Sequence, residues 1–93
     1  MPPVPGAKEN ILEEALRITS SDRRSAYGHP RNDFERTAKI SSILLGKELS
    51  AKEIVLILIA MKLSRHAFKY KRDTILDVAG YSRILSILNG DED

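Results

Sequence analysis

A run of basic side chains follows directly on the longest apolar stretch of the sequence. Residues 62–72 hold five lysines and arginines, one histidine and no acidic residue. Spacings of three and four place several of them on one helical face. Because ammonium and forked guanidinium groups both suit phosphate, we predict a site for a phosphorylated small molecule. The alternative is a solvated basic face that offsets nearby acids. The predicted phosphate ligands are Lys62, Arg65, Lys69, Lys71 and Arg72, with His66 beside them.

A second group of candidates lies in the segment D-R-R-S-A-Y-G-H-P-R at positions 22–31. Gly28 permits a positive φ and Pro30 opposes a helix through the preceding residue, so we predict a loop over residues 20–31. An aromatic ring there could stack on a base while a guanidinium meets phosphate. Alternatively, the arginines pair locally and the tyrosine closes the core. The predicted binding residues are Arg23, Arg24, Tyr27 and His29.

Two carboxylates one helical turn apart offer a metal site. Asp73 and Asp77 have the i,i+4 spacing at which two carboxylates can share Mg²⁺. The alternative is that Asp73 caps the last helix while Asp77 complements the helix dipole or pairs with Arg72 or Lys62. The sequence has no glycine-rich phosphate loop, zinc spacing or nucleophile–histidine pattern. We therefore predict ligand binding without a cofactor, and a bound Mg²⁺ is expected only under the alternative that the protein is an enzyme.

Helical periodicity predicts the elements that position these residues, because no segment of useful length alternates as a strand does. Asn32 and Ser50, each followed by a glutamate three residues later, predict helix starts, and so does Asp73. Gly46 and Asn89–Gly90 predict helix ends. The predicted fold is all-α, a four-helix bundle-like single domain. The helices are expected at residues 8–19, 32–45, 51–68 and 73–88.

The third of these helices is apolar on every side over Ile54–Met61, so we expect protein to cover it all round. Three partners in one chain can scarcely do so, and the last helix is also apolar over a wide arc. Gly80, inside that last helix, suggests another backbone close by. We therefore predict a homo-oligomer, for which closed dimers are the commonest arrangement.

Composition restricts the class of protein. The 93 residues make one domain, which we place at residues 8–90. Residues 1–7 are expected to be disordered, since they hold three prolines and a glycine, and residues 91–93 form an acidic tail. The chain has no cysteine and a net charge of only +2, which is too small to imply nucleic-acid binding. The apolar run is far shorter than the roughly 20 residues that span a bilayer, so we predict a cytoplasmic protein without a membrane partner.

Four segments carry a resemblance to known proteins: I-L-E-E-A-L-R-I (11–18), D-R-R-S-A-Y-G-H-P-R-N-D-F-E-R (22–36), K-L-S-R (62–65) and K-R-D-T-I-L-D-V-A-G-Y (71–81). Together they resemble a family of small tailed-phage proteins. The resemblance covers nearly the whole chain after its proline-rich start, and the long motif around positions 27 and 28 is its most specific part.

A looser similarity extends to phage domains associated with nucleotide modification, and through them to all-α nucleoside triphosphate pyrophosphatases of the MazG type. Those are oligomeric, Mg²⁺-dependent enzymes with closely spaced glutamates on one helix and an acidic pair near the start of another. Glu13, Glu14, Asp73 and Asp77 would be the matching positions. The acid expected one turn after Glu14 is absent, since Arg17 lies in that region, so the resemblance implies nucleotide binding more than hydrolysis.

Three functions stand as hypotheses. The first is a non-enzymatic phage protein of the infected cell that binds a nucleotide-like ligand, as a sponge for a host immune signal such as a cyclic dinucleotide. The second is a Mg²⁺-dependent nucleotide pyrophosphatase or related hydrolase. The third is a protein-interaction module whose basic face docks an acidic host protein.

Overall fold

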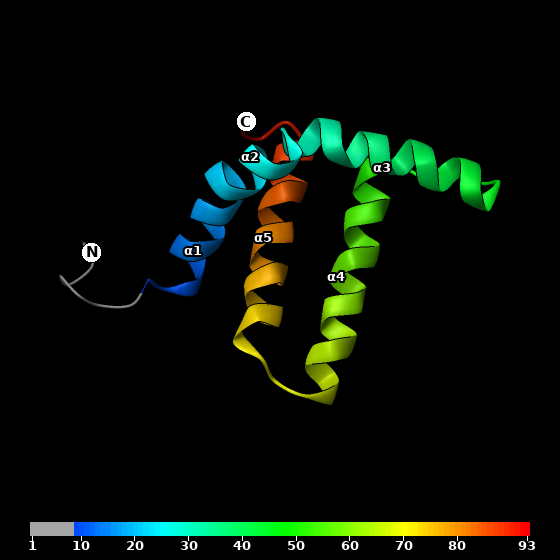
Figure 1. Cartoon of the computed structure of the whole chain (residues 1–93). Helices are drawn as coiled ribbons and strands as arrows, with labels where there is room; N and C mark the ends of the chain where they lie inside the picture. The colour runs from blue at the N-terminus through cyan, green and yellow to red at the C-terminus, as the bar shows by residue number, and fades with distance from the viewer. Residues whose placement is uncertain (1–8) are drawn as a thin grey trace.

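The computed structural model describes residues 9–93, and every regular element among them is helical. A bent N-terminal helix is followed by three further helices (Figure 1), so the prediction of an all-α fold with four helices is confirmed. The segment 1–7, predicted to be disordered, lies outside the described residues. The elements are α1 (Ile11–Arg17), η1 (Ile18–Asp22), α2 (Arg23–Tyr27), α3 (Pro30–Leu45), α4 (Ala51–Phe68) and α5 (Arg72–Leu88).

The bent helix replaces most of the loop predicted over residues 20–31, and that prediction is wrong. α1 continues without a break into η1, a π-helical turn after which the Arg23 amide donates to the Ile18 carbonyl. α2 then follows and ends at Gly28, whose φ is 82°. A π-turn holds one more residue than an α-helical turn, so it bends the helix without ending it.

The junction between α2 and α3 is only two residues long. His29 is the N-cap of α3, and its ring accepts a hydrogen bond from the Arg31 amide. Pro30 occupies the first helical position, where its missing N–H costs nothing because that donor has no intrahelical partner. The predicted N-cap, Asn32, therefore lies inside the helix, and the prediction is wrong by one turn.

Local signals place the other helix ends more accurately. Gly46 follows α3 in the left-handed region at φ 63°, as a C-terminal glycine should. The capping box predicted at the start of α4 is present, with Ser50 and Glu53 each accepting the other's amide. α5 begins earlier than predicted: Lys71 is its N-cap, without a side-chain hydrogen bond. Asp73 is therefore not the cap but part of the first turn, where its negative charge interacts favourably with the positive end of the helix dipole.

α5 lies at the centre of the fold. It packs between α1 and α4, while α3 lies across one end of the α4–α5 pair (Figure 1). Val55, Ile84 and Ile87 form the buried core, and Phe34 and Tyr81 pack against it. Helices that are distant in the sequence thus meet around α5, and they form the walls of the cavity described below.

α4 is covered on one side only. Val55 is fully buried, whereas Leu56, Ile57 and Leu63 are 54%, 56% and 50% exposed. Within one chain α5 covers one side of α4 and α3 crosses near one end (Figure 1), so the predicted cover on every side would need a second copy and stays a prediction. No helix within residues 9–93 is long and apolar enough to cross a membrane.

Candidate functional site

A cavity of about 340 Å³ lies where the bent N-terminal helix, the start of α3 and the middle of α5 meet. Most of its walls are apolar, and three aromatic rings and a few charged groups complete them. An apolar space with a small number of polar groups is typical of sites for small molecules. The side chains that give the cavity its character are Tyr27, Phe34 and Tyr81 among the rings, and Arg23, Asp33 and Asp77 among the charged groups.

Asp77 is shared unequally between two cations. One of its carboxylate oxygens lies 2.8 Å from the Lys62 ammonium, which is a hydrogen-bonding distance. The other lies 3.9 Å from a guanidinium nitrogen of Arg23, which is too far for a hydrogen bond. Within residues 9–93 this is the one ion pair of Arg23, and its side chain is 54% exposed. Lys62 therefore neutralises Asp77, while the N–H groups of Arg23 stay available to a ligand.

Arg83 of α5 is hydrogen-bonded to the π-turn that lines the cavity. Its guanidinium donates to the hydroxyls of Thr19 and Ser20, at 2.8 and 2.6 Å. Thr19 is buried and donates in turn to the Ala15 carbonyl at 2.7 Å. The two Arg83 bonds tie the π-turn to α5, about one helical turn before Arg23 at the edge of the cavity.

Gly80 faces the same π-turn across the cavity wall. A Cβ at this position would meet only the Thr19 Cγ2 atom, at 3.5 Å. The expectation of a nearby backbone is therefore wrong, because the neighbour is a methyl group from another helix. Since both residues line the cavity, the missing side chain enlarges it.

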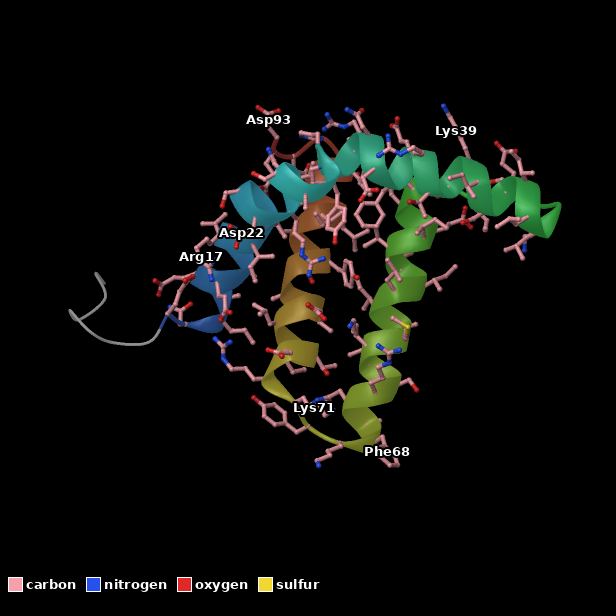
Figure 2. The ribbon with its side chains drawn as sticks, in the orientation of Figure 1. Arg17, Asp22, Lys39, Phe68, Lys71 and Asp93 are labelled. Carbon is pink, nitrogen blue, oxygen red and sulfur yellow. The ribbon has the colours of Figure 1, made fainter. Side chains whose placement is uncertain are left out.

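The segment predicted as a binding loop contributes two of its four candidates to the cavity. Arg23 and Tyr27 line it, and Tyr27 is 60% exposed, so it does not close the core. Arg24 and His29 do not line the cavity, and both contact the Asp93 carbonyl instead. Figure 2 shows Asp93 beside the junction of α2 and α3. These two side chains therefore tie the final residues of the chain to that junction.

The basic residues of positions 62–72 do not gather at this cavity within one chain. Lys62 is bound to Asp77, as one of the alternatives predicted, and Arg72 pairs with Glu14. Figure 2 shows Lys71 at the end of the α4–α5 pair that lies away from α3, whereas the cavity adjoins α3. The predicted phosphate ligands and the tyrosine segment thus belong to separate surfaces of a single chain. The members exposed to solvent without an ion pair in residues 9–93 are Arg65, Lys69 and Lys71.

The acidic residues considered for Mg²⁺ are dispersed. Asp73 is exposed in the first turn of α5, Asp77 is paired with Lys62, and Glu14 is bonded to Arg72. Across the part of the chain that the structure describes, no three histidine or acidic side chains are grouped so that they could hold a metal ion. Within residues 9–93 of one chain, the acids considered for Mg²⁺ therefore lie apart.

Comparison of the sequence with known proteins places the chain in a family. Residues 10–89 match the family described as a domain of unknown function, DUF6378. The chain belongs to the DUF6378 family. Its relatives include the Gene 55 proteins of Mycobacterium phage D29, 41% identical over 75 residues, and of Mycobacterium phage L5, 29% identical over 86 residues. The matches cover 80% and 90% of this chain, which spans about half the length of both relatives (50% and 55%). No solved structure matches.

The DUF6378 match and the two phage relatives together confirm the resemblance to a family of small phage proteins. The matched residues 10–89 include every residue that lines the cavity. Sequence reasoning did not place Asp33, Phe34 or Tyr81 in a site. Each has an ordinary local explanation, as a first-turn acid or as an apolar helical position, and only packing brings the three together. A signal was nevertheless present, since all three lie within the segments 22–36 and 71–81 that carry the resemblance.

Proposed function

We propose that this DUF6378 protein binds a nucleotide, or a closely similar phosphorylated molecule, in the cavity between α2, α3 and α5. The observation that carries the proposal is the combination of a ring-lined apolar space with Arg23, whose donors no described residue takes up. A base would lie among Tyr27, Phe34 and Tyr81, where stacking contributes roughly 1–3 kcal/mol. The phosphate would accept charge-assisted hydrogen bonds from Arg23.

Asp33 and Asp77 narrow the class of ligand. Ionised carboxylates only accept hydrogen bonds, so they suit the N–H groups of a base and the hydroxyls of a sugar. They also repel phosphate, which would therefore lie on the side of Arg23, where the cavity meets solvent. Rings and acceptors inside, with a cation at the edge, support a nucleoside that carries phosphate over free phosphate or a sugar phosphate.

The cavity volume supports a ligand of mononucleotide size. About 340 Å³ lies near the lower end of the roughly 300–1,000 Å³ that small-molecule sites enclose. A cyclic dinucleotide would need the cavities of two copies, which a homo-oligomer could place side by side. In either case the protein would act in the infected cell by sequestering its ligand.

The proposed activity is capture without chemical conversion. Within residues 9–93 no cluster of acids could hold the metal ion that a pyrophosphatase would use. The carboxylate of Asp77 is moreover neutralised by Lys62, which lowers its value as a metal ligand. A hydrolase of phage nucleotide metabolism is the competing function, and the assay below separates the two.

Calorimetric titration with mono-, di- and cyclic nucleotides tests the proposal. We expect one class of nucleotide to bind, and Arg23→Gln to weaken its binding about tenfold or more, since a hydrogen bond to a charged group contributes about 1.5–3 kcal/mol. Lys69→Gln is the matched control, because it removes another exposed cation, at the far end of the α4–α5 pair. Its affinity should stay unchanged.

Three outcomes overturn the proposal. Absence of heat with every nucleotide, at protein concentrations well above micromolar, would exclude nucleotide binding and leave a protein-interaction module to be sought by pull-down. Loss of binding in Lys69→Gln alone would move the site to the basic connector. Release of phosphate or pyrophosphate in the presence of Mg²⁺ would show an enzyme in place of a capture protein.

A further inference from the structure

The side of α4 that faces away from α5 is an unpartnered apolar surface. In a helix with 3.6 residues per turn, positions 56, 60, 63 and 67 form one stripe at alternating spacings of four and three. That stripe reads Leu-Ala-Leu-Ala, and all four residues are exposed. It faces away from the covered side of α4, on which Val55 is buried and Lys62 is ion-paired. This is the spacing with which two helices pack side by side in a coiled coil.

Ala60 lies at the middle of this surface, along the helix and around it. Leu56 and Leu63 flank it on one side and Ile57 on the other, each at least half exposed. A small central residue with larger apolar neighbours lets a second helix approach closely, with each large side chain seated beside the opposing small one. Such a surface is complementary to itself, so a second copy of the same helix fits it.

Charge favours an antiparallel arrangement of the two helices. The chain that follows α4 is strongly basic through Lys69, Lys71 and Arg72, whereas its first turn carries Glu53. Parallel helices would bring two basic ends together. Antiparallel helices separate those ends, and they set Glu53 of each copy beside the basic end of the other. The helix dipoles then also oppose each other favourably.

Two further exposed apolar groups match only in that arrangement. The second half of α3 extends past α4 on the side away from α5 (Figure 1), and there Ile43 and Leu44 are 82% and 78% exposed. Phe68, at the other end of α4 (Figure 2), is 91% exposed. An antiparallel second copy brings its Phe68 up to this projecting half of α3. The dimer would then have the α4–α4 contact and, at each end, a contact between Phe68 of one copy and α3 of the other. These end contacts enlarge the buried area, which would be small for a stable interface if the α4 stripe alone were buried.

We infer that two copies of this chain form a two-fold dimer through antiparallel α4 helices that cross at Ala60, with each α3 extending over the partner's α4 end. This names the interface of the homo-oligomer suggested above, and it does not depend on what the cavity binds. The occupant of the surface is thus a second copy, not a lipid surface or another protein.

Cysteine cross-linking tests the crossing point directly, since the sequence contains no cysteine. Ala60→Cys should give a covalent dimer under mild oxidation, because residues on a two-fold axis come within the roughly 4.4–6.8 Å between Cα atoms that a disulfide allows. Ser82→Cys, at an exposed position on α5, is the matched control and should remain without cross-link. A cross-link in both variants, or in neither, would overturn the interface.

Light scattering after size-exclusion chromatography supplies the second test. The unmodified chain should have the mass of a dimer, and Leu63→Glu should halve it while the helical circular dichroism stays unchanged. Leu12→Glu introduces the same charge at a 71% exposed leucine of α1 and should remain dimeric. A monomeric mass for the unmodified chain would overturn any homo-oligomer. A dimer that survives Leu63→Glu would overturn this interface alone.

Discussion

Asp77, which lines the cavity, lies between two cations: it contacts Lys62 from α4 and approaches Arg23 from α2. The contact with Lys62 is short and partly shielded, with the lysine side chain only 17% exposed. The approach to Arg23 is long and open to water. The first cation therefore determines how free the second is, although it does not itself line the cavity.

Replacing Lys62 should weaken ligand binding from outside the cavity. In Lys62→Met the carboxylate of Asp77 loses its close partner, and Arg23 is the nearest remaining cation. We expect Arg23 to move onto Asp77, so that affinity for the nucleotide falls about tenfold. Stability should fall by about 1 kcal/mol, since a partly exposed ion pair contributes little.

Titration calorimetry and urea denaturation measure these two effects separately. Lys69→Met is the appropriate control, since it removes a lysine that has no ion pair within residues 9–93. Unchanged affinity in Lys62→Met would mean that the ligand does not compete with Asp77 for Arg23, and the phosphate position would have to be reassigned.

The capping box of α4 makes a separate prediction, about pH. The amide of Ser50, and then its hydroxyl, hydrogen-bond the Glu53 carboxylate and lower its pKa below the ordinary value for glutamate. A lowered pKa in the folded state stabilises the protein above the ordinary pKa, and this stabilisation is lost as pH falls through the folded value. Glu53→Gln keeps an acceptor for the Ser50 amide but does not titrate. Its stability should therefore fall less on acidification, as measured by thermal unfolding between about pH 7 and about pH 3.

At the scale of elements, the sequence predicts well the helix ends that depend on contacts within one turn, and it misses those that depend on residues far away in the chain. Gly46 and the pair Ser50 and Glu53 act through bonds within one turn, so the end of α3 and the start of α4 follow from the sequence. The bend at η1 depends on Arg83, more than sixty residues away, which bonds Thr19 and Ser20. No local pattern reports such a contact, and the glycine and proline at the α2–α3 junction resemble a loop until their helical positions are known.

Gly80 provides a test of whether the cavity is used. In Gly80→Ala the added methyl group would contact Thr19 at an ordinary distance of 3.5 Å, and alanine is about 1 kcal/mol better than glycine inside a helix. The melting temperature should therefore rise by about 4–8 °C. Because the methyl group also occupies cavity space, nucleotide affinity should fall. A more stable protein with unchanged affinity would show that the ligand does not reach this part of α5.

At the scale of the whole molecule, the sequence predicted the classes of residue at the site better than their grouping. Arg23 and Tyr27 were expected and line the cavity, but Phe34 and Tyr81 join them only through the packing of α3 and α5. Lys69 and its basic neighbours were expected at the same site, and within one chain they lie away from the cavity because α4 extends away from α3 (Figure 1). Spacing along one helix fixes a face, but not which other helix faces it.

The thermal stability of the whole molecule should depend on protein concentration. The exposed surface of α4 is apolar at Leu56, Ile57 and Leu63, so pairing of two copies removes it from water and stabilises the folded state by mass action. We expect the melting temperature to rise by several degrees over about a hundredfold increase in concentration. In Leu63→Glu, which places a charge in that surface, the melting temperature should not depend on concentration. Scanning calorimetry of both proteins across the same series decides the matter, because a monomer that leaves this surface in water would give identical midpoints at every concentration.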